Sequence, residues 1–300
     1  MKPYFSILRN QTNNKAKEAS LSILGITQPE LRNHLSLQID QDEPFVTQPI
    51  FEPMFAWEKH NKQMSELSTE GLLSPAIINA LDNETNGRYK FKKSWYPFKH
   101  QYRAWKDLLS DKIQSRIITS GTGSGKTECF MIPVLEDLYR EIEKDNRQLT
   151  GVRALFLYPL NALIDSQRER LQAWTSHFGE KLRFCLYNGN TEENADKVKD
   201  TQKLYPQEVL SRERLRENPP PILVTNGSML ENMLIRQIDA PIINQSKGKL
   251  RWIILDEAHT YMGSQAAELA LQLRRVIHAF GVNAKDIHFI ATSATIAGHD

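Results

Sequence analysis

Short apolar runs recur from residue 116 onward, and amphipathic helical patterns separate most of them. The runs cover residues 116–119, 154–158, 183–187, 222–225, 252–255 and 288–291, and the helical patterns cover 128–143, 161–177, 228–238 and 264–280. Alternating strands and helices predict a parallel sheet with helices on both faces. Ile253-Ile254-Leu255 is typical of a central strand in such a sheet. Ligands of these sheets bind at the carboxyl ends of the strands.

Residues 1–95 lack this alternation and are predicted to form a mixed or helical accessory region before an α/β domain at 96–300. Three prolines between residues 41 and 55 predict an extended segment, whose aromatic side chains either pack on a neighbouring domain or contact a partner or DNA. Residues 64–81 predict one or two short helices, with a break at Gly71 and a start at Pro75. The basic and aromatic stretch 88–99 is typical of a single-strand contact surface or of a loop anchored by its rings.

Composition indicates where the protein is expected in the cell but says little about the reaction it performs. The net charge is +2, so any nucleic-acid surface must be local. No apolar run approaches the roughly 20 residues of a membrane span, and the N-terminus lacks the apolar core of a signal peptide. Cys129 and Cys185 are the only cysteines and form neither a disulfide framework nor a zinc site. These features predict a cytoplasmic protein with reduced cysteines and no membrane partner.

The stretch from Ser120 to Thr127, Ser-Gly-Thr-Gly-Ser-Gly-Lys-Thr, follows one predicted strand and precedes a helix. This is the setting of a phosphate-binding loop, in which glycines allow backbone N–H groups to point at phosphate oxygens. We expect Lys126 to reach the β- and γ-phosphates of ATP and the Thr127 hydroxyl to ligate Mg²⁺. Ser120 stands where the general pattern has glycine, as in the helicase version of the loop. The alternative is a glycine-rich turn that binds nothing.

An aspartate and a glutamate follow the apolar strand 252–255. Asp256 at the strand end can hold Mg²⁺, usually through water, and Glu257 can orient and deprotonate an attacking water. An Asp-Glu pair alone is common. Placed after an apolar strand and downstream of a phosphate-binding loop, it predicts nucleotide hydrolysis with Glu257, Lys126 and Asp256 as catalytic residues.

Asp256-Glu257-Ala258-His259 resembles the second motif of superfamily 2 helicases, the DEAH box, and other stretches resemble further motifs of that family in the same order. They are Phe98-Lys99-His100-Gln101 for the adenine-reading segment, residues 157–163 with Gln167 for motif Ia, residues 224–230 for motif Ib, and Ser293-Ala294-Thr295 for motif III. The sequences YPLNAL, VTNGSML and DEAHTY are most similar to the Lhr/MrfA-like DNA helicases, some of which serve bacterial anti-phage defence. Asn190 stands where these helicases usually have aspartate, which puts any role of that position in doubt. The resemblance covers residues 96–298.

The resemblance implies a RecA-like P-loop NTPase fold and a role for each matching position. Gln101 is expected to pair with the adenine edge and Phe98 to stack on the base. The remaining nucleotide contacts are expected from Gly121, Thr122, Gly123, Ser124, Gly125, Lys126, Thr127 and Glu128. Contacts to the nucleic-acid backbone are expected from Pro159, Leu160, Asn161, Gln167, Arg168, Thr225 and Asn226, although Thr225 and Asn226 also suit ordinary helix capping. His259, Ser293 and Thr295 are expected to link the two sites.

A helicase of this class also needs a second RecA-like domain, which supplies the arginine finger. No second parallel-sheet pattern occurs in the sequence, so we expect that domain elsewhere in a longer chain, and we expect residues 1–300 alone to bind ATP·Mg²⁺ weakly and hydrolyse it poorly. The function expected is an ATP-dependent helicase or translocase, acting on DNA by resemblance and working with defence or repair partners. The alternatives are a nucleotide-gated DNA-binding module and a restriction-type translocase, for which no nuclease motif is visible.

Overall fold

The computed structural model describes residues 4–41, 57–121 and 123–293. Contacts divide the chain into two compact units, Met1–Ala56 and Trp57–Asp300. In the first unit, α1 (Tyr4–Ile23) packs against α2 (Pro29–Gln41). Leu21 is the only described side chain of this helix pair that is buried. The proline-rich segment predicted to be extended lies outside the described residues, apart from its last aromatic neighbour, Trp57.

The second unit is built on a six-stranded parallel sheet with the order β1-β6-β5-β2-β4-β3. The strands are β1 (Arg116–Thr119), β2 (Ala154–Leu157), β3 (Phe184–Tyr187), β4 (Ile222–Thr225), β5 (Trp252–Leu255) and β6 (His288–Ser293). The parallel sheet predicted from the apolar runs is therefore confirmed, with Ile253 and Ile254 on an inner strand. Every strand runs in the same direction, so all six carboxyl ends lie along one edge of the sheet.

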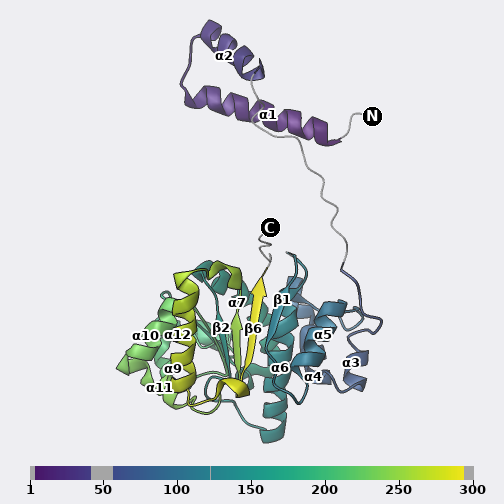
Figure 1. The fold of residues 1–300 in the computed structure, drawn as a ribbon, viewed down its shortest axis with the longest axis vertical. Coiled ribbons are helices and arrows are strands. Elements are labelled where there is room, and N and C mark those ends of the chain that lie inside the picture. The colour runs from purple at the N-terminus through teal and green to yellow at the C-terminus, as the bar shows by residue number, and fades with distance from the viewer. Residues whose placement is uncertain (1–3, 42–56, 122, 294–300) are drawn as a thin grey trace. The chain divides into compact units, whose positions relative to one another are not determined.

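Two helical layers cover the sheet (Figure 1). Alternate strand residues face opposite layers: Phe156 and Ile254 join one apolar core, and Leu155 and Ile253 join the other. The first layer holds α3 (Glu66–Thr69), α4 (Pro75–Leu81), α5 (Lys99–Leu108), α6 (Lys126–Asp145) and α7 (Asn161–Thr175). The second holds α9 (Arg212–Glu217), α10 (Gly227–Ile235), α11 (Ala240–Asn244) and α12 (Ser264–Ala279).

Shorter elements complete the unit. They are α8 (Lys199–Leu204) and the 3₁₀ helices η1 (Glu84–Tyr89), η2 (Ser176–Lys181), η3 (Asp196–Val198), η4 (Gln237–Asp239), η5 (Ala258–Thr260) and η6 (Ala284–Asp286). Among the described residues, every helix is too short or too polar to cross a membrane.

Residues 57–95 pack onto the α/β core, whereas the sequence placed a domain boundary at residue 95. Met64, Leu67 and Ile77 share one buried cluster with Trp105 of α5. The buried carboxylate of Glu136 on α6 accepts hydrogen bonds from the backbone N–H and the hydroxyl of Ser74, at 2.8 and 2.9 Å. These long-range contacts place the division between the compact units after Ala56. An accessory role for residues 1–95 stays a prediction.

The helices predicted within residues 64–81 are confirmed. They are α3 and α4, and Pro75 begins α4 after Ser74, whose side chain caps it. In the basic and aromatic stretch 88–99, three of the cations form ion pairs: Arg88 with Glu169, Lys90 with Glu84, and Lys99 with Glu58. Phe91 packs against Trp95 and Trp105. These contacts favour the loop anchored by its rings over the single-strand contact surface.

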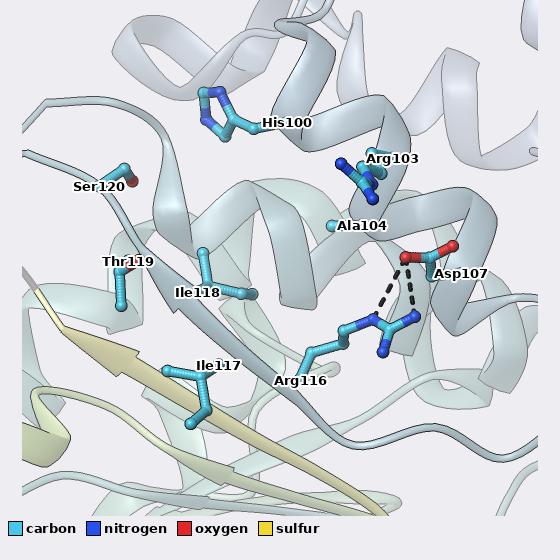
Figure 2. Close-up of a pocket in the computed structure, with 9 residues that line it drawn as sticks. All are labelled: His100, Arg103, Ala104, Asp107, Arg116, Ile117, Ile118, Thr119 and Ser120. Atoms are coloured by element: carbon cyan, nitrogen blue, oxygen red, sulfur yellow. Dashed lines mark hydrogen bonds and ion pairs between the residues drawn. The ribbon is translucent and has the colours of Figure 1, made fainter.

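One side of β1 has no neighbouring strand among the described residues. Ile117 on this strand is 76% exposed, and a cavity of about 380 Å³ separates β1 from α5. Figure 2 shows His100, Arg103 and Asp107 of α5 facing β1 across this cavity, with Asp107 accepting two hydrogen bonds from Arg116 at 2.9 and 3.2 Å. The cavity ends at Ser120, the first residue of the glycine-rich loop.

Candidate nucleotide site and nucleic-acid groove

The glycine-rich loop joins β1 to α6 at the carboxyl edge of the sheet. Gly123 and Gly125 have φ angles of 79° and 78°, which residues other than glycine rarely adopt. Gly125 is also crowded, because a Cβ there would lie 2.3 Å from Nε2 of Gln101. Thr122 lies outside the described residues. The loop therefore requires glycine at both positions because of the backbone conformation, and at Gly125 also because a side chain would not fit.

Lys126 begins α6, and its ammonium group lies against the loop. Nζ donates hydrogen bonds to the carbonyl oxygens of Ser120 and Gly121, at 2.8 and 3.3 Å. Ser124 is buried, and its hydroxyl hydrogen-bonds with that of Ser120. Thr127 follows in the first turn of α6 and is partly exposed. A cation, a helix N-terminus and a hydroxyl therefore meet at one point of the loop, where an anion is favoured.

Gln101 is placed differently from the sequence expectation. Its side chain is 2% exposed; Oε1 accepts from the backbone N–H of Phe98 at 2.9 Å, and Nε2 donates to the carbonyl of Gly125 at 3.3 Å. Both ends of the amide are therefore used to hold the start of α5 against the loop, and neither is presented to a base in this structure. Phe98 stacks on His100, whose Nε2 lies 2.9 Å from the carbonyl of Ser124.

Trp57 is a site residue that the sequence reasoning missed. Its indole lies 3.5 Å from the position of a Cβ on Gly121 and meets the ring of His100 edge-on, at 5.8 Å between centroids. The sequence signal was present, since Trp57 belongs to the aromatic series that begins in the proline-rich segment. The contact with the loop was not predictable, because Trp57 is far from Gly121 along the chain.

Asp256 and Glu257 follow β5 at the same edge, and both hydrogen-bond with the hydroxyl of Thr292, Asp256 through its carboxylate and Glu257 through its backbone N–H. The Thr292 hydroxyl of β6 donates to Oδ1 of Asp256 and accepts from the backbone N–H of Glu257, the latter at 3.2 Å. Asp256 is 9% exposed, and Glu257 has a left-handed backbone with φ of 50°. The sequence reasoning missed Thr292, which immediately precedes the predicted motif at Ser293. Its hydroxyl orients the Asp256 carboxylate and holds the backbone of Glu257.

The Glu257 carboxylate is only partly bound by the protein. Its Oε2 atom is buried without a hydrogen bond from any described residue, and Nδ1 of His259 lies 3.2 Å away, which makes an ion pair when that imidazole is protonated. The same Nδ1 lies 3.4 Å from the Ser293 hydroxyl oxygen. The structure thus brings together Glu257, His259 and Ser293, three of the residues predicted to be catalytic or coupling. Thr295 lies outside the described residues.

A second hollow, the α10–α12 groove, lies at the carboxyl ends of β2 and β4 and has a volume of about 880 Å³. Its lining includes Pro159, Leu160, Asn161 and Asn226, four of the predicted nucleic-acid contacts. Asn226 accepts from the backbone N–H of Met229 at 2.8 Å, which caps α10, and its Nδ2 donates to Oδ1 of Asn161 at 2.7 Å. Two helix N-termini, those of α7 and α10, therefore border one groove.

Three predicted nucleic-acid contacts do not line the α10–α12 groove. The Thr225 side chain is fully buried, and its hydroxyl donates to the carbonyl of Tyr187 at 2.6 Å, so its predicted surface contact is corrected to a structural role in the sheet. Gln167 accepts from Arg170 at 3.1 Å. Arg168 donates to the buried carboxylate of Glu208 at 3.0 Å; burial raises the pKa of that carboxyl, and Arg168 counteracts the rise.

A parallel α/β domain with a phosphate-binding loop after β1 and an Asp-Glu pair after β5 is a P-loop nucleotide-binding domain of the RecA-like kind. Residues 98–300 match the DEAD/DEAH box helicase family, and the chain belongs to that family. The predicted resemblance to superfamily 2 helicases of the Lhr/MrfA-like group is thereby confirmed, together with the relatives described next.

Two curated proteins of Escherichia coli are similar to this chain. The Druantia protein DruE is 28% identical in sequence, and the match covers 67% of this chain and 16% of DruE. The Lhr helicase/uracil glycosylase is 29% identical, and the match covers 61% of this chain and 12% of Lhr. The crystal structure of the DUF1998 helicase MrfA bound to DNA superposes with a TM-score of 0.55 at 25% identity, covering 80% of this chain and 26% of MrfA. Proteins named as RNA helicases match as well. The chain thus spans less than a third of each of the three relatives described.

Proposed function

We propose that this chain is the ATP-binding motor domain of an ATP-dependent helicase or translocase that acts on DNA. One observation carries the proposal. The candidate nucleotide site lies at the carboxyl ends of β1, β5 and β6, and the α10–α12 groove lies at the carboxyl ends of β2 and β4, so both lie along one edge of the same sheet. Between the two sites β5 and β2 are paired strands, and the backbone N–H of Asp256 donates to the carbonyl of Leu157 at 3.0 Å. A rigid sheet thus connects the two sites.

ATP is the ligand that suits the loop. Backbone N–H groups between Gly121 and Lys126 and the N-terminus of α6 would bind its phosphates. Lys126 would exchange its present carbonyl partners for phosphate oxygens, which is favourable because a charged acceptor forms a stronger hydrogen bond than a neutral one. Phe98 and Trp57 are the aromatic groups near the loop on which the base could stack.

Mg²⁺ fits the oxygen donors of the site. The Thr127 hydroxyl and the Asp256 carboxylate are the residues proposed to hold it, and Mg²⁺ takes its remaining ligands from phosphate and water. When bound, the cation neutralises charge on the phosphates. The Glu257 side chain is 29% exposed at this edge, so its carboxylate can accept the proton of an attacking water.

The α10–α12 groove is proposed to bind the nucleic-acid backbone. Asn161 and Asn226 are short polar side chains at helix N-termini, which suit phosphate contacts that carry no base information. The preference for DNA over RNA is supported by the similarity to MrfA, whose structure was solved with DNA. A second RecA-like domain in the same longer chain and defence or repair partners belong to this proposal; the chain covers 16% of DruE and 26% of MrfA.

The proposal is tested by ATP turnover of the complete natural protein with single-stranded DNA, double-stranded DNA and RNA in parallel. We expect DNA to stimulate hydrolysis and Lys126→Ala to abolish it. Stimulation by RNA alone would overturn the DNA assignment. A folded protein that shows no hydrolysis with any nucleic acid would overturn the motor assignment.

A further inference from the structure

Arg170 connects the helix that follows the phosphate loop to the helix that borders the groove. It lies on α7, whose first residue, Asn161, lines the α10–α12 groove. Its Nη2 atom lies 3.7 Å from Oε1 of Glu128, in the first turn of α6, and the two side chains are 20% and 16% exposed. Because little solvent surrounds the pair, the two charges interact more strongly than an exposed pair does.

Glu128 in turn touches the loop itself. A Cβ placed on Gly125 would lie 3.0 Å from Oε2 of Glu128, so this carboxylate oxygen packs against the loop backbone while the other faces Arg170. A shift of the loop around a phosphate therefore displaces the carboxylate that Arg170 faces.

The guanidinium of Arg170 is held in one orientation by planar contacts. It lies over the rings of Tyr89 and Trp174, at 5.4 and 5.7 Å from their centroids, and Nη1 donates to Oε1 of Gln167 at 3.1 Å. The indole N–H of Trp174 donates to the carbonyl of Tyr89 at 2.8 Å, which fixes one ring relative to the other. A lysine cannot reproduce this combination of stacking and a forked set of donors.

Two buried polar atoms near this arginine lack partners among the described residues. They are Nε of Arg170 itself and the hydroxyl of Tyr158, at the end of β2. Burial and the charge of Asp256 raise the pKa of the Tyr158 hydroxyl well above its usual range, and Arg170 opposes the rise, so both charged groups act on this hydroxyl. Buried polar groups without partners are uncommon in native proteins, and two of them lie close to the Arg170–Glu128 pair.

We propose that Arg170 is a positioning residue that couples occupancy of the nucleotide site to binding in the α10–α12 groove. The inference rests on the proposed function and adds to it a specific connection, from Gly125 through Glu128 and Arg170 to α7. Phosphate binding at the loop moves Glu128, Arg170 follows its partner, and α7 carries the movement to Asn161. Coupling of this kind is a free energy shared by both ligands, so each must change the affinity for the other by the same factor.

The test measures that factor in the 300-residue chain. Dissociation constants are determined for a fluorescent non-hydrolysable ATP analogue with Mg²⁺, in the presence and absence of a single-stranded DNA oligonucleotide, and for the oligonucleotide with and without the analogue. Each ratio is the dissociation constant of one ligand without the other divided by that with it. For the wild type we expect the two ratios to be equal, with a value of about 5–150. In Arg170→Met, which keeps an apolar stem under the rings, we expect the ratio to fall to about one while each affinity measured alone stays within about twofold of wild type.

Two further variants make the result specific. Glu169→Gln removes an exposed ion pair with Arg88 at the neighbouring position of α7 and keeps a side-chain oxygen that can accept from the Tyr89 hydroxyl, so its ratio should stay that of the wild type. Arg170→Lys keeps the charge without the planar fork, and its ratio should fall between those of the wild type and Arg170→Met. If Arg170→Met does not fold, Arg170→Lys decides.

A wild-type ratio in the folded arginine variants overturns the inference, as does a wild type that binds both ligands with a ratio of one. In these cases the proposed function stands. A folded wild type that binds neither ligand overturns the proposed function, and the inference falls with it.

Discussion

Replacing Gly125 with alanine tests whether the loop is shaped by its contact with Gln101. The added methyl group would lie 2.3 Å from Nε2 of Gln101 and 3.0 Å from Oε2 of Glu128, and the backbone would keep a φ of 78°. Gln101 is almost fully buried and cannot move into solvent without losing its own hydrogen bonds. Gly125→Ala therefore combines backbone strain with displacement of a buried amide.

The magnitude follows from these two parts. A left-handed conformation costs an alanine about 1–2 kcal/mol. Displacing Gln101 removes its hydrogen bonds with Phe98 and Gly125, which contribute about 1 kcal/mol each. The free energy of unfolding should therefore fall by roughly 3–4 kcal/mol, a large part of the about 5–15 kcal/mol that stabilises a typical domain. ATP affinity should fall as well, because the strained residue lies in the loop.

Gly123→Ala is the matched control. Gly123 has nearly the same φ, 79°, but no heavy atom lies within 4 Å of its added Cβ, so only the strain of about 1–2 kcal/mol applies. Chemical denaturation of both variants gives the difference. In the double variant Gln101→Ala/Gly125→Ala the clash is gone, so the two changes should cost less together than the sum of the single effects. Equal losses for the two glycine variants, or strict additivity in the double variant, would refute the reasoning.

Three further results are expected from single changes. Arg168→Ala should lower the free energy of unfolding by about 1–3 kcal/mol in denaturant titrations, because the buried Glu208 carboxylate loses its cation. DNA affinity should stay unchanged. A loss of DNA affinity without a loss of stability would instead support the predicted contact of Arg168 with nucleic acid. Cys129 is buried and its thiol pKa is raised to about 12 by burial, so native protein should resist iodoacetamide at neutral pH, and mass-spectrometric labelling of Cys129 before unfolding would contradict its placement. Glu257→Gln should reduce ATP turnover by about 10²–10⁴-fold without weakening ATP binding; full function with bound ATP would favour the nucleotide-gated binding module over the motor.

The fold could be predicted because its signal is local. Each strand of the sheet is a short apolar run. The glycine-rich loop, the Asp256-Glu257 pair, Asn161 and Asn226 each follow such a run, so parallel pairing brings them to one edge. The packing of residues 57–95 was not predictable in this way, since it depends on contacts such as Ser74 with Glu136, which are distant along the chain.

The candidate site shows the same limit in individual residues. A motif reports that Thr225 and Gln101 belong to the site but not where their polar atoms are bound. Thr225 is buried because its hydroxyl meets a carbonyl on β3, and Gln101 is buried because its amide meets Gly125. Arg168 likewise finds Glu208 only in the folded chain. Thr292 carries no motif signal of its own, and its importance follows from the register that places it beside Asp256.

The central claim, that the glycine-rich loop binds ATP, is tested most directly by calorimetric titration of the 300-residue chain with ATP and Mg²⁺, beside Lys126→Ala. We expect weak, Mg²⁺-dependent binding at one site of the wild type and no measurable binding to the variant, with both proteins unfolding at the same denaturant concentration. A folded wild type that does not bind ATP, or a Lys126→Ala variant that binds it equally well, would show that the glycine-rich loop is not an ATP site.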